Sequence, residues 1–164
     1  MNKIQPLDRL SLIIGNHKKE GKRIILTNGC FDLLHIGHVR YLREARALGD
    51  ILVVALNGDK SVRSLKGRGR PFLREEERAL LLSALTCVDY VTLFTDSTVE
   101  RILLALKPHI HAKGSDYTEK SVPERDIVLS YGGQIAITGG PKIRSTSDII
   151  EAIVSRHHSK NGDQ

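Results

Sequence analysis

Short apolar runs recur along the chain, separated by longer segments in which apolar residues return at helical spacing. Five runs predict buried β-strands, because they are mostly aliphatic or aromatic and end at turn-forming residues. These predicted strands cover residues 23–27, 51–57, 90–94, 109–112 and 134–138. Apolar strands of this kind are typical of a parallel sheet that helices cover on both faces.

The intervening segments predict helices. Residues 1–22 form a helical lead-in with regularly spaced leucines and isoleucines. Two Ser-x-x-Glu sequences, at residues 97–100 and 121–124, have the spacing of a capping box at a helix start. The polar residues 157–164 are expected to form a frayed tail. Further predicted helices cover residues 37–48, 59–65, 74–85, 97–107 and 145–156.

The alternation of strands and helices predicts one α/β domain. A chain of 164 residues has the size of a single domain. Strand–helix–strand units give parallel strands joined by right-handed crossovers. We therefore expect a Rossmann-like, doubly wound fold with a mainly five-stranded parallel sheet. Ligands bind such sheets at the carboxyl ends of the strands, here the loops after Thr27, Asn57, Ala112 and Thr138.

Composition narrows the possible partners. The net charge of +6 favours an anionic partner, but aromatic residues make up only 4% of the chain and tryptophan is absent. Single-stranded nucleic acid is bound through aromatic stacking, so the composition gives little support to single-stranded nucleic acid as the partner. Cys30 and Cys87 form no Cys-x-x-Cys pair, which excludes a zinc finger and suits a reducing cytoplasm. No long apolar run or secretory leader is present, so no membrane partner is expected.

The loop after the first strand carries the clearest chemical signal. It contains neither Gly-x-Gly-x-x-Gly nor a P-loop. Instead His35 and His38 lie three residues apart around Gly37, where a helix is predicted to begin. Amide hydrogens at a helix N-terminus attract phosphate, and two imidazoles there can donate hydrogen bonds to its oxygens. A single histidine would more often be structural, but the pair around a glycine favours phosphate binding.

Residues 29–38, Gly-Cys-Phe-Asp-Leu-Leu-His-Ile-Gly-His, resemble the signature of the cytidylyltransferase-like nucleotidyltransferases. The resemblance extends from about residue 23 to 153 and is closest to the adenylyltransferase domain that makes ADP-heptose from ATP and heptose 1-phosphate. Four more segments support it: Asn-Gly-Asp at 57–59, Leu-Lys-Gly…Arg-Pro at 65–71, Lys-Gly-Ser-Asp-Tyr at 113–117 and Ser-Thr-Ser-Asp-Ile-Ile at 145–150. Ser147 departs mildly from the threonine usual in the family.

The resemblance implies a role for each matching residue. Magnesium is expected to enter with ATP, and no protein metal site is predicted. Catalytic roles fall on His35, His38, Lys66 and Thr146. The nucleotide is expected to contact Asn28, Gly29, Cys30, Phe31, Gly37, Lys113, Gly114, Arg144 and Ser145, with the backbone at 113–114 reading the adenine. Asp32, Asn57 and Asp116 are candidates for binding the acceptor.

Nucleotidyl transfer requires the protein mainly to position the two substrates. A phosphate monoester is mostly dianionic at neutral pH, so it is already a nucleophile and needs no general base. Simpler interpretations remain open for several residues. Lys66 can be a solvated lysine, Ser145 a helix cap, and Asp32 the cap of a local turn. Arg78 is interpreted as a surface residue that lies near Glu75 or Arg74.

Other functions remain open. The same fold can use glycerol 3-phosphate with CTP, although residues 86–91 depart from that branch, or flavin mononucleotide with ATP. The His-Ile-Gly-His sequence also occurs in one class of tRNA synthetases, for which this chain is too short. A basic nucleic-acid-binding domain is the non-enzymatic alternative. The kinase domain that some ADP-heptose enzymes carry is absent from the chain, and a homodimer is possible by analogy with the family.

Overall fold

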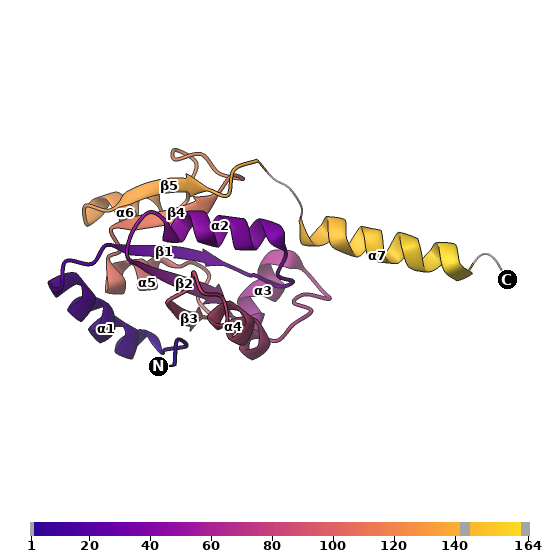
Figure 1. Cartoon of the computed structure of the whole chain (residues 1–164), viewed down its shortest axis with the longest axis horizontal. Helices are drawn as coiled ribbons and strands as arrows, with labels where there is room; N and C mark the ends of the chain where they lie inside the picture. The colour runs from indigo at the N-terminus through magenta and orange to yellow at the C-terminus, as the bar shows by residue number, and fades with distance from the viewer. Residues whose placement is uncertain (1, 142–144, 162–164) are drawn as a thin grey trace.

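The computed structural model describes residues 2–141 and 145–161, with residues 157–161 as backbone. Within this part of the chain, five parallel strands form one sheet in the order β3-β2-β1-β4-β5 (Figure 1). The predicted doubly wound α/β fold is therefore confirmed. The strands are β1 (Ile24–Gly29), β2 (Ile51–Asn57), β3 (Tyr90–Phe94), β4 (Ile110–Gly114) and β5 (Gln134–Thr138).

Strand β1 lies at the centre of the sheet and at its topological switch point. Thr27 of β1 pairs with Val54 of β2 on one side and with Ala112 of β4 on the other. The chain moves outward through β2 and β3, then returns across β1 to add β4 and β5. In open sheets of this kind, the ligand crevice forms where the strand order reverses, so a site is expected beyond the end of β1.

Helices cover both faces of the sheet. One face packs on α1 (Leu7–Lys19), α5 (Glu100–Leu106) and α6 (Arg125–Ser130), and its core includes Leu10, Ile102 and Val128. The other face packs on α2 (Ile36–Arg46) and α4 (Glu75–Ser83), with Leu42 and Leu82 in its core. Burial of these apolar side chains supplies the main drive for folding. The remaining helices are α3 (Asp59–Lys66) and α7 (Thr146–Asn161).

Neither capping box predicted from Ser-x-x-Glu spacing forms. Helix α5 begins at Glu100 after Val99, which makes no side-chain cap, and α6 begins at Arg125 after Glu124. The Glu124 carboxylate lies 3.2 Å from the Lys113 ammonium, so it is engaged away from the helix end. Ser121 closes a local turn by accepting a hydrogen bond from the Thr118 amide. At α6, a tertiary partner of Glu124 thus takes the place of the local cap.

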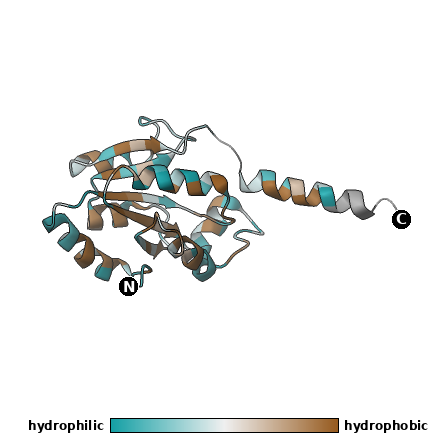
Figure 2. Cartoon of the chain, in the orientation of Figure 1, coloured by the Kyte–Doolittle hydropathy of each residue, from teal (hydrophilic) through white to brown (hydrophobic). Residues whose placement is uncertain are grey.

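Helix α7 extends away from the sheet in Figure 1. It continues to Asn161, and residues 162–164 lie outside the described part, so the expected fraying of residues 157–164 stays a prediction. Figure 2 shows apolar residues along this helix, and Ile153 and Val154 are exposed.

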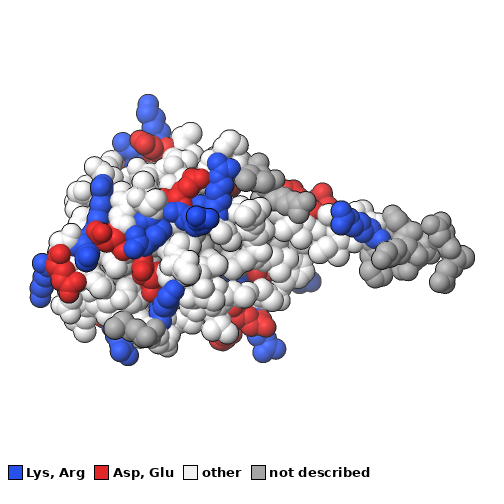
Figure 3. All heavy atoms as spheres, in the orientation of Figure 1, with Lys and Arg blue, Asp and Glu red and all other residues white. Residues whose placement is uncertain are grey.

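Among the described residues, no helix is long and apolar enough to span a bilayer. Figure 3 shows basic and acidic side chains lying side by side on the viewed face.

Candidate active site

A cavity of about 850 Å³ lies at the carboxyl ends of the strands. Its walls come from the ends of β1, β2 and β4, the start of α2, the end of α3 and the start of α7. All predicted site residues in the described part of the chain line this cavity, whereas Arg144 lies outside the described residues. The fifteen that line it are Asn28, Gly29, Cys30, Phe31, Asp32, His35, Gly37, His38, Asn57, Lys66, Lys113, Gly114, Asp116, Ser145 and Thr146.

The β1–α2 loop holds the two histidines in a fixed arrangement. His35 is the N-cap of α2, and its Nδ1 accepts a hydrogen bond from the Gly37 amide at 3.1 Å. This bond leaves the proton on Nε2, which is therefore the donor. The His35 and His38 ring centroids lie 3.9 Å apart. The pair therefore presents two imidazoles beside the positive end of a helix.

The loop reaches this arrangement through an unusual backbone. Phe31 adopts a left-handed conformation with φ of 45°, and its ring lies 5.2 Å from that of His38. A Cβ at Gly29 would meet the Phe31 ring at 3.0 Å. Any larger residue at position 29 would therefore crowd the Phe31 ring. Left-handed backbone in a residue other than glycine is often found at functional sites, where surrounding contacts maintain it.

Burial and, to a smaller extent, the neighbouring His35 lower the pKa of His38 to about 4, and a hydrogen bond with the Leu33 backbone opposes them only in part. His38 is therefore neutral near pH 7. As pH falls from 6.5 towards 4, unfolded His38 binds a proton that the folded protein does not, so stability is lost across this window.

In the wild type this loss of unfolding free energy amounts to as much as about 3 kcal/mol, and we expect His38→Gln to abolish it. Unfolding free energies at pH 7 and 4.5 measure it; equal losses in wild type and variant would contradict it.

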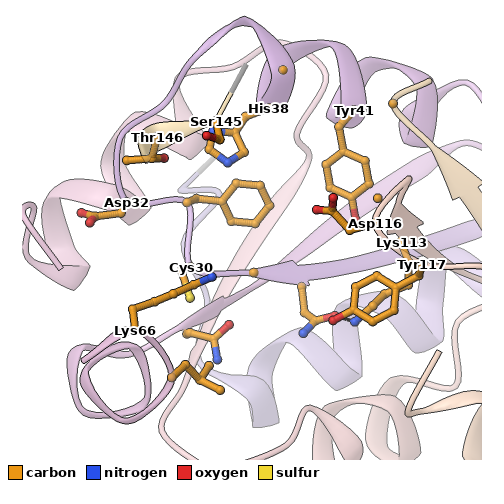
Figure 4. Close-up of a pocket in the computed structure, with 18 of the residues that line it drawn as sticks. Cys30, Asp32, His38, Tyr41, Lys66, Lys113, Asp116, Tyr117, Ser145 and Thr146 are labelled. Carbon is orange, nitrogen blue, oxygen red and sulfur yellow. Dashed lines mark hydrogen bonds between the residues drawn. The ribbon is translucent and has the colours of Figure 1, made fainter. Parts of the chain in front are cut away.

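The basic loop after α3 is attached to the β1–α2 loop through Asp32. The Asp32 carboxylate accepts hydrogen bonds from Arg70 Nη1 at 2.9 Å, Phe72 N at 2.8 Å and Leu73 N at 3.1 Å. Lys66, at the start of this loop, is exposed, and Figure 4 shows its amino group directed towards Cys30. Asp32 therefore fixes the loop that presents Lys66 to the cavity, and its predicted acceptor role stays a prediction.

Replacing Asp32 is expected to loosen the basic loop. Asp32→Ala leaves two amides and one guanidinium without their acceptor, and each such bond contributes about 1 kcal/mol. We expect trypsin to cut after Lys66 and Arg68 at least about fivefold faster, since the loss of even one such bond shifts an opening equilibrium by about that factor. Peptide mapping over time measures the rate. Asp96→Ala, which removes a surface ion pair, is the control; an unchanged loop cleavage in Asp32→Ala would refute the anchoring role.

Arg78 is buried, so its interpretation as a surface residue near Glu75 or Arg74 was wrong. Its side chain is 0% exposed and joins four segments at the base of the site. Nε donates to Leu73 O, Nη1 to the Cys30 and Asn57 carbonyls, and Nη2 to Asp59 Oδ1, at 2.6–3.0 Å. Arg78 thus links the end of β2 to the residue that follows β1 and holds both in position.

Lys113 at the end of β4 belongs to a second polar cluster. Its ammonium lies 3.1 Å from Asn28 Oδ1, 3.2 Å from the Glu124 carboxylate and 4.8 Å from the Tyr117 ring centre. Burial raises the pKa of Glu124, but the nearby His111 and the Lys113 charge outweigh this and bring it to about 2. Glu124 is therefore ionised at neutral pH. Sequence reasoning missed Glu124 because its spacing from Ser121 suggested a cap.

The start of α7 contributes the remaining wall. Ser145 and Asp148 cap the helix reciprocally: the Ser145 amide donates to Asp148 Oδ2 at 2.7 Å, and the Asp148 amide donates to Ser145 Oγ at 3.2 Å. The capping interpretation of Ser145 is thus confirmed, and phosphate binding by Ser145 and Thr146 stays a prediction. In Figure 4 both residues lie near His38.

Imidazoles and a lysine around a cavity at the switch point of a parallel sheet define a nucleotidyltransferase-type site. The family model described as cytidylyltransferase-like matches residues 26–152, and the chain belongs to this family. "Bifunctional protein HldE" of Pelobacter propionicus is 51% identical over 95% of this chain, and that of Geobacter sulfurreducens is 48% identical over 94%. The chain spans 32% of the length of each of these two relatives.

Solved structures show the same architecture. A lipopolysaccharide core biosynthesis protein from Thermoplasma volcanium has a TM-score of 0.61 and 30% identity, over 71% of this chain and 94% of that one. Pantothenate synthetase from Thermus thermophilus has a TM-score of 0.60 at 16% identity, over 88% of this chain and 63% of that one. The second likeness concerns the fold alone.

Proposed function

We propose that this chain transfers AMP from ATP to heptose 1-phosphate, giving ADP-heptose and pyrophosphate for a lipopolysaccharide-type surface glycan. The observation that carries the proposal is the pairing of His35 and His38 at the start of α2, facing the cavity. The choice of acceptor is supported by the family resemblance, the identity to HldE proteins and the similarity to a lipopolysaccharide biosynthesis protein. We propose a cytoplasmic location for the reaction, which the use of ATP as the donor supports.

The reaction is an in-line displacement at the α-phosphorus of ATP. An oxygen of the acceptor phosphate forms the new bond to this phosphorus, and the bond to the departing pyrophosphate breaks. His35 and neutral His38 donate hydrogen bonds to phosphate oxygens as negative charge shifts onto the leaving group, and Lys66 neutralises that charge. These groups are in place before the reaction, so positioning and electrostatics supply the rate.

Magnesium enters this scheme with the triphosphate. The Asp32 carboxylate already accepts three hydrogen bonds from the basic loop. Among the described residues, no group of three or more histidine, cysteine or acidic side chains could hold a metal ion. We therefore assign the magnesium ligands chiefly to ATP phosphate oxygens and water, an arrangement common for this ion. When bound, the ion would offset phosphate charge.

Substrate choice can be tested by measuring pyrophosphate release with magnesium. ATP and CTP are each combined with heptose 1-phosphate, glycerol 3-phosphate and flavin mononucleotide. We expect release only with ATP and heptose 1-phosphate. Release with CTP or another acceptor would retain the nucleotidyltransferase chemistry and refute the proposed substrates. Absence of release with every pair would refute the proposal and direct attention to salt-sensitive nucleic-acid binding.

We also infer a homodimer that uses α7. Ile153 and Val154 are 60% and 49% exposed on this helix, and Ile149 and Ile150 lie one turn earlier. Two copies of such a helix can cover each other's apolar surface in a symmetric interface. Sedimentation velocity should give twice the chain mass for the wild type and the chain mass for Ile153→Glu. A monomeric wild type at micromolar concentration would refute the dimer.

A further inference from the structure

We propose that Lys113 is a specificity-determining residue for the phosphorylated sugar acceptor and that Glu124 positions it. The inference rests on the proposed function, because it assigns one end of the same cavity to the sugar phosphate. The Lys113 side chain is 7% exposed, yet it lines the cavity together with Asn28, Tyr117 and Glu124. These four residues are called the Lys113 cluster below.

The topology separates the Lys113 cluster from the phosphate-binding groups. Strand β1 lies between β2, which leads through α3 to Lys66, and β4, which ends at Lys113 and Gly114. Lys66 and Lys113 therefore approach the cavity from opposite sides of the central strand. Figure 4 shows the same division, with His38, Ser145 and Thr146 gathered at one end and Lys113, Asp116 and Tyr117 at the other.

The chemistry of the Lys113 cluster fits a sugar phosphate better than an adenine base. A buried ammonium and an amide side chain offer hydrogen bonds that match hydroxyl groups and phosphate oxygens, and the Tyr117 ring offers an apolar surface to a sugar ring. An uncharged base placed against the Lys113 ammonium would displace water from this charge and would replace that hydration with only weak contacts. The backbone at 113–114 stays available to the base, since the inference concerns side chains alone.

Glu124 acts on the acceptor through Lys113. One carboxylate oxygen of Glu124 lies 3.2 Å from the Lys113 ammonium and the other 3.4 Å, and Asn28 Oδ1 lies 3.1 Å from it. The Glu124 side chain is only 10% exposed, and the cation beside it that offsets its charge is the ammonium of Lys113, whose side chain is 7% exposed. Without this carboxylate, the ammonium of Lys113 loses the partner that fixes its position.

The test separates the two substrates kinetically. Lys113→Met keeps the side-chain length and removes the charge, so we expect the KM for heptose 1-phosphate to rise about ten- to hundredfold, the effect of one lost charged hydrogen bond. The KM for ATP is expected to stay within about threefold. Glu124→Gln should raise the same acceptor KM by a smaller factor, and Glu124→Asp should restore part of it. Lys120→Met, an exposed lysine on the neighbouring loop, is the matched control.

The outcomes distinguish this inference from the proposed function. If the wild type releases no pyrophosphate with any sugar phosphate, the proposed function and this inference fall together. If the wild type is active but Lys113→Met raises the two KM values equally, or only that for ATP, the acceptor assignment is overturned and the function stands. If Lys113→Met shows the acceptor effect but Glu124→Gln matches the wild type, the positioning role is overturned. Thermal unfolding confirms that each variant is folded.

Discussion

His38→Ala is expected to lower kcat at least a hundredfold while the protein stays folded. The neutral imidazole of His38 faces the cavity beside His35, and in the proposed mechanism it donates to a phosphate oxygen as charge develops there. Loss of one such donor from a prearranged site typically costs a factor of about 100 to 1,000 in kcat. Steady-state pyrophosphate release at saturating ATP, acceptor and magnesium gives the value.

The control for this variant is His17→Ala. His17 lies on α1, away from the cavity, and contacts the Tyr90 hydroxyl at 3.0 Å. Its loss is expected to change kcat less than threefold, on the scale of one structural hydrogen bond. A His38→Ala enzyme that kept its activity within a few-fold of the wild type would show that this imidazole has no part in stabilising the transition state.

Arg78→Met is expected to lower the free energy of unfolding by about 3–5 kcal/mol, as found when one partner of a buried ion pair is removed. The substitution leaves three carbonyl oxygens and the Asp59 carboxylate without their donors, in a region where water cannot readily replace them. Arg78→Lys should recover only part of the loss, because one ammonium cannot reproduce the fork of the guanidinium. Denaturant unfolding at pH 7 measures these differences.

A matched surface substitution sets the scale for Arg78. Arg101 is 70% exposed and lies 3.9 Å from Asp96, and exposed pairs of this kind contribute about 0–1 kcal/mol. Arg101→Met is therefore expected to be nearly neutral. A loss below about 1 kcal/mol for Arg78→Met would mean that the buried guanidinium is not what holds the ends of β1 and β2 together.

The sequence predicted best those features that depend on neighbouring residues. The five strands follow from local apolar runs, and their parallel arrangement follows from the alternation with helices. The histidine pair could also be predicted from the sequence, because His35, Gly37 and His38 lie within four positions of one another at the start of one helix. Once the sheet is parallel, the loops after its strands must meet at one edge, and the predicted site residues assemble there.

Arg78 and Glu124 could not be interpreted correctly, because their partners are distant in sequence. Arg78 binds the carbonyl of Cys30, 48 residues away, and Glu124 binds Lys113, 11 residues away. Periodicity and capping patterns describe only a few neighbouring positions, so Arg78 resembled a solvated helix residue and Glu124 resembled part of a cap. Arg78 follows three glutamates at the start of α4, so its sequence neighbours gave no sign that its side chain is buried.

Transfer with ¹⁸O-labelled substrate tests the central claim most directly. The labelled reactant is heptose 1-phosphate with ¹⁸O in all non-bridging phosphate oxygens, supplied with ATP and magnesium. If an acceptor oxygen attacks the α-phosphorus, mass spectrometry should find the whole label in ADP-heptose, including the new bridge, and unlabelled pyrophosphate. Label in the released pyrophosphate, or formation of AMP without ADP-heptose, would contradict the account.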